Sequence, residues 1–236
     1  MKTRHSLAIG ALSLLLLTSI AFGQQAYIGR YDIYTGFMYL DSSAINLGET
    51  GFHTQVGMNM TKWYSLGFDF STGTGDTTLT PGMLKSSLQQ QINAEVGQLK
   101  AAGVIPANYA LGVPMHSRTE TYAVGPQVNY RHFGAVTLFI HPDLGAMHEV
   151  ATPHPDDALG QAFVAQYAAS GVKADWVGFY GVGGGFDLNI TRHYGMKVHV
   201  DFVRDALFSD LLNHRNELRF SIGPTVHFGS NVAEKK

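Results

Sequence analysis

Two pairs of residues in this sequence have a spacing that could support acid-base or nucleophilic chemistry: His141 with Asp143, and His199 with Asp201. Residues two apart on a β-strand share a face, so each carboxylate could orient the neighbouring imidazole. Such a dyad also needs an activated nucleophile, and no serine of the chain lies in a recognisable motif. The pairs alone therefore do not identify an active site.

A second group of histidine and aspartate side chains lies around the start of a long polar segment. Imidazole and carboxylate groups are common metal ligands, but these residues lack the spacing of a compact metal motif. We therefore expect a solvated loop here, with no metal ion and no cofactor. The group consists of His141, Asp143, His148, His154, Asp156 and Asp157.

Gly181, Gly183 and Gly185 form an alternating glycine run. A dinucleotide-binding loop needs the full G-x-G-x-x-G spacing and a following strand-to-helix turn, and neither is present. Small residues on one wall of a narrow barrel make room for bulky side chains on the opposite wall, such as Phe139 or Tyr34. We expect the glycines to serve packing.

The elements that would position these residues are eight segments in which apolar and polar residues alternate with a period of two. Short and long connections also alternate, as in a closed antiparallel barrel with short turns at one end and long loops at the other. The segments run near 30–40, 51–60, 64–71, 119–130, 135–147, 177–190, 196–204 and 216–228. The long loops run near 41–50, 72–118, 149–175 and 205–215.

Three prolines, Pro126, Pro142 and Pro224, fall inside these segments. Proline cannot donate a hydrogen bond to a neighbouring strand, and every strand of a closed barrel is paired on both sides. Each proline is therefore predicted to mark a β-bulge or a strand end.

The two faces of the segments differ in charge. One face is aliphatic and aromatic without charged residues, and aromatic residues gather near both ends, as Trp63, Tyr130 and Tyr194 do at the short-turn end. Interfacial aromatic girdles have this arrangement, and about ten tilted residues per strand cross the hydrocarbon core. The prediction is an all-β, eight-stranded antiparallel up-and-down transmembrane β-barrel with two helix-containing external loops.

The polar face of the segments would then line the lumen. An eight-stranded barrel is just wide enough for side chains to fill it, and buried charges must be paired. The predicted lumen network comprises Asp32, His53, Asp69, His141, Asp143, Asp187, Lys197, His199, Asp201, Arg219 and His227.

Residues 1–23 have the basic start, the leucine-rich stretch and the small residues of a secretory signal, which leaves residues 24–236 as one barrel domain. The absence of cysteine means that no disulfide stabilises this exported chain. A formal net charge of −2 gives no indication of nucleic-acid binding.

Two long loops contain helical patterns. The first is predicted to begin at Thr80 and Pro81 and to end at Gly103, and the second to begin at Pro155 and to end at Gly171. Both helices are amphipathic, so we expect them to pack on each other or on the barrel rim, or to form a lid or a binding surface.

The C-terminal third resembles the small outer-membrane barrels of the OmpA/OmpX type. The resemblance rests on the runs GGGFDLNITRH at 183–193, VDFVR at 200–204 and NELRFSIG at 216–223, and no peptidoglycan-binding domain follows the barrel. It implies location in the bacterial outer membrane, contact with outer-membrane lipid, and insertion by the barrel-assembly machinery. The expected assembly signal is Phe220, Ile222, Val226 and Phe228.

Three functions remain open at this point. The first is a structural or surface-binding barrel whose long external loops contact an unknown extracellular partner, without enzymatic activity. The second is a narrow pore or a transport barrel for small solutes. The third is a lipid-modifying enzyme that uses one of the two histidine and aspartate pairs.

Overall fold

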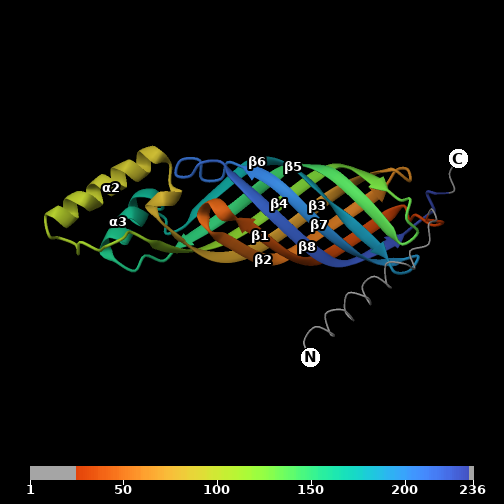
Figure 1. Ribbon diagram of the computed structural model, residues 1–236, viewed down its shortest axis with the longest axis horizontal. Helices are drawn as coiled ribbons and strands as arrows, with labels where there is room; N and C mark the ends of the chain where they lie inside the picture. The colour runs from red at the N-terminus through yellow and green to blue at the C-terminus, as the bar shows by residue number, and fades with distance from the viewer. Residues whose placement is uncertain (1–24, 234–236) are drawn as a thin grey trace, which may run out of the picture.

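The computed structural model describes residues 25–233, which form a closed barrel of eight antiparallel strands in sequence order. The predicted signal, residues 1–23, lies outside the described residues. In Figure 1 the strands run along the long axis of the molecule, and two helices lie beyond one end. The strands are β1 (Tyr31–Ser42), β2 (Leu47–Asn59), β3 (Tyr64–Leu79), β4 (Val113–Tyr130), β5 (Val136–Pro153), β6 (Lys173–Asn189), β7 (Tyr194–Asp205) and β8 (Arg215–Phe228).

Pairing between β1 and β8 closes the barrel, with Tyr31 opposite Phe228 and Asp41 opposite Leu218. Every other strand pairs with its two neighbours in sequence. A closed sheet has no unpaired edge, which is the requirement for strands in a bilayer. The predicted fold class is therefore confirmed.

Several strands extend further toward the loop end than the sequence pattern indicates. β3 continues past Ser71 to Leu79, which pairs with Val113 at the start of β4, and β5 continues to Pro153. Residues 72–79 consist mainly of threonine and glycine and have no apolar outer face. Hydropathy alternation therefore ends where the apolar belt ends, although the hydrogen-bonded ladder continues.

The prediction for the three prolines is wrong in its details. Bridge pairing between β4 and β5 stops after Val124 and Leu144 and resumes at Val128 and Ile140 in the same register. No residue is inserted, so the region around Pro126 and Pro142 is neither a bulge nor a strand end. Pro224 lies in a similar interruption between β1 and β8. Placing two prolines on facing strands confines both missing donors to one gap.

The helices are shorter than predicted. The first begins with a 3-10 turn, η2 (Pro81–Met83), and the α-helix proper is α2 (Ser86–Ala101). Leu84 between them is extended and forms a β-bridge with Leu212, which explains the break. The second helix is α3 (Ala158–Tyr167). Within residues 25–233, no helix is long and apolar enough to cross a bilayer.

The outer wall of the barrel is apolar and the inner wall is polar. Phe37, Ile140 and Leu144 on the outer wall are 55%, 57% and 57% exposed. Aromatic side chains lie near both ends of this belt, including Trp63 near the tight turns and Trp176 near the loops. A continuous exposed apolar belt around a polar interior is the pattern of a barrel that lies in lipid.

Candidate functional site

The lumen contains all the residues predicted for the polar network, and none is more than 8% exposed. Near the tight turns, His227 Nδ1 lies 2.6 Å from Asp32 Oδ1, and its Nε2 lies 3.4 Å from Asp187. Lys197 donates to Gln55 Oε1 at 2.9 Å. The alternating strands therefore direct these charged groups inward, where they pair with each other.

Halfway along the lumen, Arg219 links β7 and β8 to the opposite wall. Its Nε donates to Asp201 Oδ2 at 2.9 Å, and its Nη1 donates to Thr121 Oγ1 at 2.9 Å and to Ser71 Oγ at 3.2 Å. Side chains from three strands thus surround one guanidinium group. Such a cross-link fills the lumen rather than leaving a channel.

The two predicted histidine and aspartate pairs differ in the structure. His141 Nδ1 lies 3.0 Å from Asp143 Oδ1, so this pair is hydrogen-bonded. His199 makes no hydrogen bond through either ring nitrogen, to Asp201 or to any other described residue. No hydrogen bond joins His199 to Asp201, so the predicted dyad is absent; Asp201 instead accepts through Oδ2 from Arg219 Nε.

A third arrangement has the connectivity of a catalytic triad. His53 Nδ1 lies 2.8 Å from Ser221 Oγ, and His53 Nε2 lies 2.9 Å from Asp69 Oδ1. Ser221 is 0% exposed, however, and lies on the inner wall of a filled barrel. A nucleophile must reach the substrate, so this arrangement acts as a buried hydrogen-bond network.

A second ionic cluster at the loop end of the lumen was not predicted. Arg215 donates to Glu149 Oε2 at 2.6 Å and to Asp205 Oδ1 at 3.3 Å, and Glu217 Oε1 lies 3.3 Å away. All four side chains are buried. Glu217 shares a face with Arg219 in a predicted strand, so alternation could have identified it. The other three lie where the expected strands had already ended.

Above this cluster, the long loops form a packed body that we call the helical extension, residues 80–112 and 154–172. Its apolar core contains Ile92 of α2 and Leu159 and Phe163 of α3. The loop between β7 and β8 closes the mouth of the barrel with Leu207, Phe208, Leu211 and Leu212, all at most 6% exposed. The helices therefore pack on the rim and share one apolar cluster with it.

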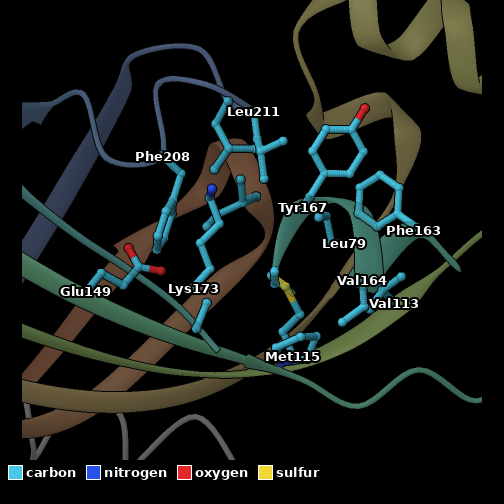
Figure 2. A pocket seen from close by; sticks show the side chains of 15 residues that line it. Leu79, Val113, Met115, Glu149, Phe163, Val164, Tyr167, Lys173, Phe208 and Leu211 are labelled. Atoms are coloured by element: carbon cyan, nitrogen blue, oxygen red, sulfur yellow. The ribbon is translucent and has the colours of Figure 1, made fainter. Parts of the chain in front are cut away.

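Figure 2 shows the apolar cavity beneath α3, lined by Phe163, Tyr167, Met115 and Phe208, with Lys173 and Glu149 at its side. Its volume is about 40 Å³. That volume holds a water molecule or two, whereas ligand pockets measure hundreds of Å³. The cavity is therefore a packing defect under the helical extension, and not a ligand site as it stands.

Comparison with known proteins rests on solved structures, since neither a family model nor a curated protein matches this chain. Neisserial surface protein A superposes with a TM-score of 0.51 at 8% identity, covering 84% of this chain and 96% of that one. Ail of Yersinia pestis gives a TM-score of 0.48 at 8% identity, with 85% and 99% covered. OprG of Pseudomonas aeruginosa gives 0.48 at 11% identity, with 88% and 100% covered.

The chain has the fold of the small eight-stranded outer-membrane barrels. This confirms the resemblance that the C-terminal motifs indicated. Together with the apolar belt, it indicates location in the bacterial outer membrane. The predicted assembly residues Phe220, Ile222, Val226 and Phe228 lie on the lipid-facing side of β8, each 37–41% exposed.

The predicted patch of histidine and aspartate residues near the third long loop is not one site in this outer-membrane barrel. His141 and Asp143 point from β5 into the lumen of the barrel. His148 stacks on Trp176, with ring centroids 4.4 Å apart. Asp157 caps a helix. The longer β5 explains the difference, because its pleat sends successive residues to opposite faces.

Asp157 links α3 to the segment that follows α2. Its Oδ1 accepts from Gly160 N at 2.6 Å, and its Oδ2 accepts from the Tyr109 hydroxyl at 2.8 Å. The backbone hydrogen bond from Gly160, followed by that from Tyr109, lowers the pKa of Asp157. Burial, reinforced by the hydrogen bond to Asp157, raises the pKa of Tyr109 to about 12. One carboxylate thus connects the two long loops.

Asp157→Ala is expected to destabilise α3 by about 1 kcal/mol, because the helix loses its N-cap. Since the pKa of Asp157 is lower in the folded protein, its stabilisation is complete above about pH 4 and is lost as the pH falls through the folded value. Hydrogen exchange, expressed as protection factors for Gly160 and Gln161, measures both effects. Asp157→Asn should keep most of the cap but lose the pH dependence. If the pH dependence survives in this variant, a group other than Asp157 causes it.

Proposed function

We propose that this protein is a non-enzymatic, non-conducting outer-membrane barrel that presents its helical extension outside the cell as a binding surface. The observation that carries the proposal is the contrast between the two ends. One end has tight turns, whereas the other supports α2 and α3, which share one packed apolar cluster with the barrel rim. Loops that are only connectors do not need a packed core.

The filled lumen counts against a pore. Arg219 bridges the lumen at mid-height, and Arg215 lies within a buried cluster of three carboxylates near the mouth. Above them, Leu207 and Phe208 are at most 5% exposed. A solute would have to displace paired charges and then an apolar plug. The pore alternative therefore has no supporting feature among the described residues.

The orientation follows the rule that outer-membrane barrels have short periplasmic turns and long external loops. We place the turns near Trp63, Tyr130 and Tyr194 in the periplasm, and α2 and α3 outside. The lipid-facing side of β8, which ends at Phe228, would be recognised by the barrel-assembly machinery.

The exposed face of α2 indicates the kind of partner. Gln90, Gln91, Asn93 and Gln98 are exposed there, with Glu95 as the only exposed charge in this part of the helix. Amide side chains both donate and accept hydrogen bonds. A polar, nearly neutral surface of this kind suits a hydrogen-bonding partner, such as a glycan or a polar protein surface, better than a strongly charged polymer.

Replacing residues 80–112 with a two-residue Asn-Gly turn tests the proposal, because Leu79 and Val113 are already paired across the β3–β4 hairpin. Cells that produce the full chain should bind members of a panel of immobilised glycans and proteins, and cells with the shortened chain should lose that binding. Equal heat-modifiable mobility in gels would show that both chains have inserted. In planar bilayers, the full chain should give no stepwise conductance.

An epitope inserted at the exposed Gly103 tests the orientation, with an insertion at His132 in a tight turn as the matched control. Antibody should label intact cells only for the first insertion. Labelling of the His132 insertion alone, or a stable conductance from the full chain, would overturn the proposed function.

A further inference from the structure

The central layer of the lumen brings together three imidazoles and a carboxylate from three strands, β2, β5 and β7. The geometry points to a site for a divalent transition-metal ion of the zinc class, held by Asp201 with nitrogens of His199, His53 and His141. Ligand atoms of His53, His199 and Asp201 lie within 4.8 Å of one another, as do those of His141, Asp143 and Asp201. Asp201 is common to both groups.

Three of the four proposed ligand residues have ring nitrogens or a carboxylate oxygen without a hydrogen-bond partner. Both ring nitrogens of His199, Nε2 of His141 and Oδ1 of Asp201 are buried without a hydrogen bond. His199 is 0% exposed and is surrounded by the rings of Tyr34, His53 and Phe139, with centroids 4.8–5.0 Å away. A buried polar group without a partner costs about 1–3 kcal/mol, so such a cluster indicates a missing ligand.

A glycine on β6 creates the space between these groups. Gly183 pairs with His141 of β5 on one side and with Asp201 of β7 on the other. His141 Nε2 therefore approaches Asp201 Oδ1 to 3.4 Å across an intervening strand. A Cβ atom at Gly183 would lie 2.8 Å from His141 Nε2 and would also contact Asp201 Oδ1. The glycine thus keeps open the place where the ligand atoms converge.

Two further carboxylates already hold the imidazoles as metal-binding histidines are usually held. Asp143 contacts His141 Nδ1, which leaves Nε2 free as the ligating atom. Asp69 contacts His53 Nε2, which leaves Nδ1, now 2.8 Å from Ser221 Oγ. A carboxylate that accepts the second ring proton fixes the tautomer and strengthens the nitrogen ligand.

The charge of the layer favours a cation. With neutral imidazoles, the three carboxylates Asp69, Asp143 and Asp201 carry one more charge than the two cationic groups Arg219 and Lys197. This excess of negative charge favours a cation over an anion at the site. Imidazole ligands favour zinc, copper or nickel, whereas calcium and magnesium prefer oxygen ligands. The nitrogen-rich set therefore selects a transition metal.

The test is to refold the untagged mature chain in detergent with Co²⁺ or Zn²⁺, pass it over a chelating resin, and measure bound metal. We expect about one ion per chain, visible absorption typical of low-coordinate Co²⁺, and a higher unfolding temperature with Zn²⁺. His199→Gln should lower the metal affinity by about tenfold or more. Loss of a residue that only supports a ligand already has an effect of this size, and His199 would be a direct ligand.

His227→Gln is the matched control, because it removes another buried lumen imidazole that lies next to Asp32, outside the cluster. Asp201→Asn serves as a second variant, but it also removes the partner of Arg219, so its folding must be checked. His199→Gln avoids this difficulty because His199 has no hydrogen-bond partner to lose. No retained metal in the unsubstituted chain, or equal retention by His199→Gln, overturns the inference.

Discussion

Arg215→Leu is expected to lower the free energy of unfolding by about 3–5 kcal/mol. The guanidinium group is 1% exposed and is shared by Glu149, Asp205 and Glu217. Removing it leaves buried carboxylates without a counter-charge, so they must take up protons or admit water. Urea titration of the folded chain in lipid vesicles, followed by tryptophan fluorescence, measures the change.

Arg204→Leu is the control for this prediction. Arg204 precedes Asp205 on β7 but points outward and is exposed. The same loss of charge should therefore change the stability by less than about 1 kcal/mol. If the two variants were equally stable, the ionic cluster would not contribute to stability. A smaller loss in Arg215→Leu at low pH, where the carboxylates are protonated, would support the proposed cause.

Ile140→Arg is expected to destabilise the inserted barrel by about 2–4 kcal/mol. Ile140 is 57% exposed in the middle of the apolar belt, so an arginine there would lie in hydrocarbon. In a water-soluble barrel the same change would be neutral or would improve solubility. Folding titrations into vesicles, compared with the unsubstituted chain, therefore test directly whether the apolar wall faces lipid.

Val172→Arg is the matched control, since Val172 is 38% exposed just before β6 on the loop side of the belt. We expect a change of about 0–1 kcal/mol there. A large effect at Val172 with none at Ile140 would show that the assigned position of the bilayer along the barrel is wrong. The pair of substitutions thus also maps the loop-side boundary of the membrane.

The sequence by itself determined the number of strands, the two faces and the charged interior. Period-two alternation is a local property, and Phe37 or Asp201 is assigned to a face by its immediate neighbours. Long and short connections are equally local, so the two ends of the barrel could also be distinguished. Helix α3 was recognisable because the signals for its start at Pro155 and its end at Gly171 are local.

Only the tertiary structure decided which inward residues meet. His53, His141 and His199 come from β2, β5 and β7, and their proximity depends on barrel closure and register. The Arg215 cluster could not be predicted because the strands continue beyond the apolar belt. In that region the alternation of apolar and polar residues no longer marks a strand. The loop with Phe208 has no periodic pattern, so its burial follows from packing against α3 and the rim. These contacts are long-range, which is why local sequence patterns do not encode them.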